Sequence, residues 1–258
     1  MEPFLWELGA AAFAAGLVDA VMGGGGMLQV PALAALLPGV SPAVLLGTNK
    51  FASAVGTAGA TFQYLRSVPP RWTVVVPAAA AAFAFSVAGA YALTMVPAHP
   101  MRKALPFLLL ALLAYSAFNP LGLTHAPRYE PRREAAIAAA GAGAIGFYDG
   151  FFGPGAGTFY KLIFVRLLGF DFLNSAAPAK IANLASNLGA VPVFLLQGLL
   201  IWKVALVMAA ANFAGGQFGA RIALRYGNRL IRWVFLAVVG ALVGRTFYDA
   251  YLVPAGPG

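Results

Sequence analysis

Long stretches without a charged residue, over 74–97 and 104–124, restrict this chain more than any other feature of its sequence. An α-helix of about 20 residues, at 1.5 Å per residue, crosses the ~30 Å hydrocarbon core of a bilayer. The composition agrees, because 61% of the residues are hydrophobic and only 10% are charged. Alternating segments of about ten residues, which a membrane β-barrel needs, are absent. The sequence therefore predicts an all-α, polytopic membrane protein.

The charged residues are placed as in a membrane protein whose connections face water. The net charge is +9, and most of the basic residues lie between the apolar segments. This placement is typical of positive-inside anchoring and makes nucleic-acid binding the weaker interpretation. The first seven residues contain two glutamates and no basic residue, unlike the start of a cleaved signal peptide. We therefore expect the first helix to be retained.

A glycine-rich break followed by a lysine occurs twice in the chain, and the two copies are 130 residues apart. The matching landmarks are Asp19 and Asp149, the glycine-rich segments 23–26 and 153–157, Lys50 and Lys180, and Trp72 and Trp202. Duplicated, broken segments in a membrane chain are typical of transporters whose binding site lies between two related halves.

Each half is expected to contain about five helical segments. They cover 4–22, 27–37, 42–66, 72–97 and 100–120 in the first half, and 134–152, 157–168, 172–197, 202–226 and 229–252 in the second. The halves are predicted to span 1–125 and 134–258, joined by a polar, proline-bearing connection over 126–133. The segments 27–37 and 157–168 are too short to cross a bilayer alone, and whether they cross or re-enter is left open.

The distribution of basic residues favours an inverted repeat. If all five segments of each half change sides, the connections 66–71, 121–133 and 221–232 share one side and hold nine arginines. The connections on the other side then hold only Arg102, Lys103 and Lys203. If the short segments return without crossing, the basic residues divide evenly. The positive-inside rule prefers the first arrangement, in which an odd number of crossings inverts the second half and both termini lie outside.

The glycines at both breaks are candidates for binding an anion through the backbone. Non-helical backbone at membrane depth is tolerated where protein covers it or where it lines a water-filled cavity. The helices that follow each break would present N–H groups and the positive end of a helix dipole. The candidate residues are Gly24, Gly25, Gly26, Gly155 and Gly157. Close packing of helices through small residues is the alternative interpretation.

Lys50 and Lys180 lie in apolar surroundings. A lysine at the centre of a membrane helix costs at least ~2.5 kcal/mol. Snorkelling to the interface explains many single lysines, but a duplicated lysine at equivalent positions is harder to explain in this way. Each lysine is therefore expected either to bind an anionic substrate or to pair with Asp19 or Asp149.

Polar residues accompany both lysines. Asn183 and Asn187 follow Lys180 at i+3 and i+7, so they share one helix face with it. Additional candidates for the same site are Thr48, Asn49, Ser53 and Thr158. Such a polar face is directed towards protein or water and away from lipid, and hydrogen bonding between helices is the alternative role.

Asp19 and Asp149 each precede a glycine-rich break by about one helical turn. A carboxylate inside a membrane indicates proton coupling or a lysine partner. A structural role as a cap beside the break is the alternative, and the sequence leaves these three roles open.

No catalytic or cofactor motif is present. Walker A, GxSxG, HExxH and CxxC patterns are missing, the chain has no cysteine, and its two histidines lie in connections. We therefore expect neither an enzyme nor a bound cofactor or metal, and no ATP-driven transport by this chain alone.

Taken together, these residues resemble the TauE/SafE (sulfite exporter) family of membrane transporters. The resemblance rests on Asp19 with glycines 23–26, on the segments 47–50 and 150–158, and on 180–189 with Trp202 and 219–221. It covers nearly the whole chain. It implies transport of sulfite, sulfonates or related small sulfur anions across the bacterial inner membrane. It also implies that the glycines above contact the substrate together with Thr48, Asn49, Lys50, Thr158, Lys180, Asn183 and Asn187.

The second copy of the pattern departs from the first. Pro178 and Ala179 stand where the first half has Thr48 and Asn49. Two chemically unequal halves suit one asymmetric anion better than two equivalent ions.

We therefore expect a multi-pass secondary transporter that exports a small sulfur oxyanion by alternating access, with the anion bound between the two repeats. Its expected partners are the anion and the lipid bilayer, with no nucleic acid, and a homo-oligomer is left open. The alternatives are an anion channel and a transporter for an organic anion without sulfur.

Overall fold

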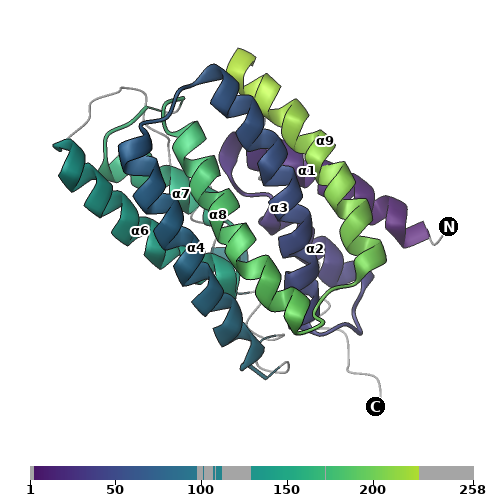
Figure 1. The fold of residues 1–258 in the computed structure, drawn as a ribbon. Coiled ribbons are helices and arrows are strands. Elements are labelled where there is room, and N and C mark those ends of the chain that lie inside the picture. The colour runs from purple at the N-terminus through teal and green to yellow at the C-terminus, as the bar shows by residue number, and fades with distance from the viewer. Residues whose placement is uncertain are drawn as a thin grey trace.

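The computed structural model of the protein describes residues 3–97, 101, 107, 109–111, 129–171 and 173–226. Within these residues every regular element is helical (Figure 1). The helices are α1 (Pro3–Met22), α2 (Gly26–Leu36), α3 (Pro42–Ser67), α4 (Trp72–Thr94), α6 (Pro131–Phe151), α7 (Ala156–Leu162) with the π-helical turn η1 (Ile163–Leu167), α8 (Ala176–Leu196) and α9 (Trp202–Tyr226). The predicted helices over 100–120 and 229–252 lie outside the described residues, apart from positions 101, 107 and 109–111.

Three of the described helices are long and apolar enough to cross a membrane. They are Phe4–Met22 in α1, Trp72–Thr94 in α4 and Ala176–Leu196 in α8. Apolar side chains such as Trp6, Phe85 and Leu196 are exposed on the outer faces of these helices, as expected for surfaces that contact lipid. The predicted class, an all-α membrane protein, is confirmed.

The long helices pack in two groups that meet at the centre of the molecule. In one group α1 and α3 pack on α9, and in the other α6 and α8 pack on α4. Figure 1 shows α4, α8, α3 and α9 side by side, and α3 and α8 form the contact between the groups. Each group therefore combines two helices from one predicted half with one helix from the other.

The contacts correspond when positions 130 residues apart are exchanged. A Cβ atom at Gly89 of α4 would lie 2.0 Å from the carbonyl oxygen of Phe147, and one at Gly219 of α9 would lie 2.3 Å from that of Leu17. In both places two helix backbones touch, as small residues allow in membranes. The predicted repeat agrees with this arrangement. Its inverted orientation in the bilayer and the limits 1–125 and 134–258 stay predictions.

The start of α6 differs from the sequence-based expectation. The helix was expected from 134 and begins at Pro131, because proline is favoured in the first turn and the N–H of Glu134 already donates to the carbonyl of Glu130 at 2.9 Å. Glu134 is buried, and the guanidinium of Arg71 donates to its carboxylate at 3.3 Å. The helical conformation therefore takes in residues that the sequence placed in the connection 126–133.

Two other segments also depart from the predicted limits. The segment 157–168 is not one α-helix, because α7 ends at Leu162 and continues as the π-helical turn η1. The helix expected from 172 begins at Ala176, because the carboxylate of Asp171 accepts a hydrogen bond from the backbone N–H of Asn174 at 2.7 Å and holds a turn. In addition, Arg221 and Arg225, which the sequence placed in a connection, belong to α9.

The contact between α1 and α9 predicts opposite outcomes for two glycine-to-alanine changes on α1. A Cβ atom at Gly16 would lie 2.2 Å from the carbonyl oxygen of Asn212, whereas one at Gly9 would be 3.6 Å from a methyl carbon of Val207. Gly16→Ala should push the helices apart and destabilise the protein by about 1–3 kcal/mol. Gly9→Ala, the matched control, should leave stability unchanged or raise it by up to about 1 kcal/mol through helix propensity. Thermal unfolding of the purified variants in detergent measures both, and equal melting temperatures would contradict the close contact.

Candidate functional site

Both glycine-rich breaks interrupt a helix in the middle of the molecule. The α1 helix ends at Met22 and α2 begins at Gly26, while α6 ends at Phe151 and α7 begins at Ala156. Gly23 and Gly153 adopt φ angles of 87° and 95°, a left-handed conformation that glycine adopts without steric cost. The chain therefore changes direction at both breaks and leaves backbone groups near the centre of the fold.

The two breaks touch each other. The backbone N–H of Thr158 donates to the carbonyl of Gly23 at 2.9 Å, and its hydroxyl donates to the carbonyl of Met22 at 3.0 Å. A Cβ atom at Gly157 would lie 2.5 Å from the oxygen of Gly23, so the two backbones leave no room for a side chain. We call this contact the Gly23–Gly157 crossing.

Two lysine–aspartate ion pairs lie beside this crossing, and each joins the two predicted halves. Lys50 on α3 contacts the carboxylate of Asp149 on α6, and Lys180 on α8 lies 2.5 Å from a carboxylate oxygen of Asp19 on α1. The sequence left open whether the lysines pair with these aspartates. The structure shows that they do, and that each pair combines a residue from the first half with one from the second.

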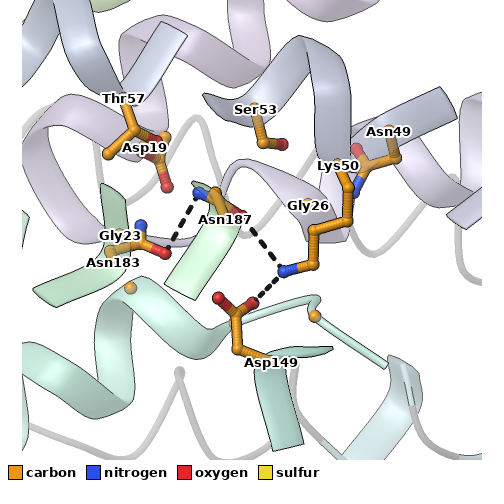
Figure 2. Close-up of a pocket in the computed structure, with 13 residues that line it drawn as sticks. Asp19, Gly23, Gly26, Asn49, Lys50, Ser53, Thr57, Asp149, Asn183 and Asn187 are labelled. Atoms are coloured by element: carbon orange, nitrogen blue, oxygen red, sulfur yellow. Dashed lines mark hydrogen bonds and ion pairs between the residues drawn. The ribbon is translucent and has the colours of Figure 1, made fainter. Parts of the chain in front are cut away.

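The first pair is embedded in a hydrogen-bond network. The ammonium of Lys50 also donates to the side-chain carbonyl of Asn187 at 3.0 Å, and Asn187 contacts Asn183 at 3.5 Å (Figure 2). The hydroxyl of Ser186 donates to the carboxylate of Asp149. A lysine with three N–H donors is thus held at a fixed place beside the second break.

The two pairs differ in their access to water. The side chains of Lys50 and Asp149 are 3% and 2% exposed, whereas those of Lys180 and Asp19 are 6% and 15% exposed. Removing two charges from water costs several kcal/mol for each ion, and their attraction offsets this cost only with good geometry and further hydrogen bonds. Buried pairs of this kind are weak contributors to stability, so their presence at membrane depth points to function.

A small cavity lies between the breaks and the first ion pair, and we call it the central cavity. The space between its atoms is about 280 Å³, open solvent at its mouth included. Its lining consists of polar side chains and glycines from both halves (Figure 2). These residues are Asp19, Gly23, Gly26, Asn49, Lys50, Ser53, Thr57, Asp149, Gly153, Gly155, Gly157, Asn183 and Asn187.

Most of the predicted site residues meet at this cavity, and a few have other roles. Thr48 donates its hydroxyl to the carbonyl of Val44 at 2.7 Å and accepts a hydrogen bond from the N–H of Ile201 at 3.1 Å, so it joins α3 to the start of α9. The N–H of Gly25 donates to the carboxylate of Asp19 at 3.3 Å, and the carbonyl of Gly24 accepts a bond from the second helix. Thr158 takes part in the crossing. The part that each residue plays in binding stays a prediction.

One lining residue offers an unused hydrogen-bonding atom. Asn49 is 3% exposed, and its side-chain carbonyl has no partner among the described residues. A buried polar atom without a partner costs about 1–3 kcal/mol. An atom left in this state beside a polar cavity indicates that a ligand or water completes its hydrogen bonding.

Sequence reasoning missed several residues of this region. Gly23, Gly153 and Thr57 line the central cavity, although only the first two lie in the repeated motif. Thr57 stands seven positions after Lys50, on the same helix face, and this spacing was the available signal. Lys161 on α7 is a third buried lysine, and its ammonium donates to the carbonyl of Val21 at 2.9 Å. The repeat did not mark it, because the equivalent position in the first half is Pro31.

Comparison with known proteins agrees with this arrangement. The pattern of the sulfite exporter TauE/SafE family matches residues 8–246. The chain belongs to the TauE/SafE family. It is therefore a membrane transporter by descent.

Relatives of similar length carry the same general description. A probable membrane transporter protein of Sinorhizobium is 38% identical over 239 residues, which is 93% of this chain and 90% of the relative. A probable membrane transporter protein of Escherichia coli K12 is 36% identical, with 93% and 88% of the two chains covered. A third, from Haemophilus influenzae, is 35% identical and covers 92% of each chain. No solved structure matches the sequence.

The buried ion pair predicts a specific pattern of stabilities. Asp149→Asn leaves the ammonium of Lys50 buried without a carboxylate, which should cost about 3–5 kcal/mol. The double variant Lys50→Met/Asp149→Asn removes both charges and should recover most of this loss. Lys203→Met, at an exposed position in the first turn of α9, should change stability by less than about 0.5 kcal/mol. Thermal unfolding in detergent tests the series, and a single variant as stable as the wild type would contradict a charged pair at this site.

Proposed function

We propose that this protein is a secondary transporter that exports a small sulfur oxyanion, such as sulfite or an organosulfonate, across the bacterial inner membrane. The observation that carries the proposal is the pair of crossed lysine–aspartate contacts beside a small polar cavity at the centre of the fold. Family membership supplies transport, and the cavity supports the anionic substrate.

The lining of the central cavity suits an oxyanion. The ammonium of Lys50, the amides of Asn183 and Asn187 and the hydroxyl of Ser53 are hydrogen-bond donors, and the oxygens of sulfite are acceptors. The N–H groups at the start of α2 have no acceptor within their own helix, and Gly26 brings that backbone to the cavity. A volume of about 280 Å³ accepts a small anion with a few waters and excludes bulky organic molecules.

The aspartates make binding competitive. An anion that contacts Lys50 must replace Asp149 as its partner, or arrive together with a proton that neutralises this carboxylate. Both outcomes couple binding to the ion pair, so Asp149 and Asp19 are the candidate coupling residues. The membrane potential also favours export, since an anion that leaves a negative interior gains about 2.3 kcal/mol per charge for each 100 mV.

The packing groups suggest how access would alternate. Lys50 and Asp19 belong to the group α1, α3 and α9, whereas Asp149 and Lys180 belong to the group α4, α6 and α8. Rocking of one group against the other would open and close both ion pairs. The anion would offset the loss of a carboxylate partner while the pairs are open, so that the empty open state is disfavoured.

Flux measurements in liposomes test the site directly. We expect saturable sulfite flux with the wild type, and a loss of about tenfold or more in Lys50→Met/Asp149→Asn and in Lys180→Met/Asp19→Asn, which remove charge without leaving an unpaired ion. Lys203→Met is the matched control and should retain full flux. Sulfonates, carboxylates, phosphate and chloride complete the panel. Normal flux in both double variants would contradict the central-cavity site, and flux of carboxylates alone would favour an organic anion without sulfur.

Alternating access predicts counterflow. Liposomes preloaded with unlabelled sulfite should take up labelled sulfite faster than empty ones, because the loaded site returns more readily than the empty one. Steady current through single molecules, without saturation or counterflow, would instead identify an anion channel.

A further inference from the structure

A second cavity, which we call the lysine cavity, adjoins the central cavity. Gly23 and Gly157 line both cavities, so the Gly23–Gly157 crossing forms the wall between them. The lysine cavity is smaller, with about 180 Å³ between its atoms. Its lining is made of small and apolar residues together with Lys161 and Lys180.

The charge on this lining is positive. Two lysines and no carboxylate occur among the described residues that line the lysine cavity. The lining of the central cavity carries Lys50 with Asp19 and Asp149. The two cavities together therefore contain three lysines and two aspartates, a formal charge of +1 that one monovalent anion would balance.

Lys161 holds a fixed position in this cavity. It is 3% exposed, and its ammonium donates one hydrogen to the carbonyl of Val21 at the end of α1. An ammonium has three hydrogens to donate, so this contact orients the group and leaves donor capacity for a ligand. Lys180 lies at the border, because it lines the lysine cavity while its partner Asp19 lines the central one.

We infer that the lysine cavity is a second binding site for the same class of ligand, a small oxyanion, with Lys161 and Lys180 as its cationic contacts. This inference rests on the proposed function, because it makes the cavity the next position on the path of the anion. An anion that leaves the central cavity passes the Gly23–Gly157 crossing and meets two ammonium groups in apolar surroundings. Low polarity strengthens these contacts relative to water.

The second site occurs on one side of the crossing only. The equivalent of Lys161 in the first half is Pro31, which offers no donor, so the path has no matching cationic position there. The asymmetry gives the path a direction, from a site with mixed charge to a site with cations alone.

Equilibrium binding of sulfite to the purified full-length protein in detergent tests this site. Lys161→Gln removes the charge and keeps an N–H donor for the carbonyl of Val21, so it separates binding from a structural role. Isothermal titration compares it with the wild type, and Lys203→Met is the control that loses the same charge at an exposed position. We expect Lys161→Gln to weaken sulfite binding by about tenfold or more, as loss of a charge-assisted contact does, and Lys203→Met to bind as the wild type does.

A second series separates the two cavities. Lys50→Met/Asp149→Asn removes the ion pair of the central cavity, and residual sulfite binding in this variant should disappear when Lys161→Gln is added. Unchanged residual binding, or Lys161→Gln that binds as the wild type does, would overturn the second site. Wild-type protein that binds sulfite without moving it across liposomes would contradict the proposed transport alone. No sulfite binding by the wild type would contradict both.

Discussion

A charge inside a bilayer requires an opposite charge or a ligand, and this requirement organises the centre of the protein. Lys50 and Lys180 are buried, and each is paired with an aspartate that the chain places about 100 or more residues away. Because the partners lie on different helices, α1, α3, α6 and α8 must converge before either pair can form. The breaks, the cavities and the packing of α3 on α8 all lie around this convergence.

The sequence predicted the members of this centre better than their partners. A spacing of 130 residues marks Asp19, Asp149, Lys50 and Lys180 as equivalent, and equivalence is a relation between positions in the two copies. Whether a lysine meets the aspartate of its own copy or of the other depends on how the copies pack, and no local pattern contains that information. The helix limits near Pro131 and Ala176 were misplaced for a similar reason, since a buried Glu134 and a turn at Asp171 decided them.

Residues without a repeat were the hardest to find. Lys161 has Pro31 as its counterpart, and it stands in a segment that periodicity assigned to one plain helix. The structure divides that segment into α7 and η1 and brings the lysine beneath the end of α1. The two copies thus share a frame of glycines, lysines and aspartates and differ at positions where a single, asymmetric ligand has only one orientation.

The exchange of helices between the two groups also affects how the protein is made. The first helix, α1, packs on α9, and the chain delivers α9 only after the other described helices have left the ribosome. During synthesis the glycine-lined face of α1 must therefore stay without its partner in the bilayer or in the insertion machinery. The carboxylate of Asp19 waits for Lys180 over nearly the same length of chain. Assembly of the core is consequently a late event, and neither half can complete its packing while the other is absent.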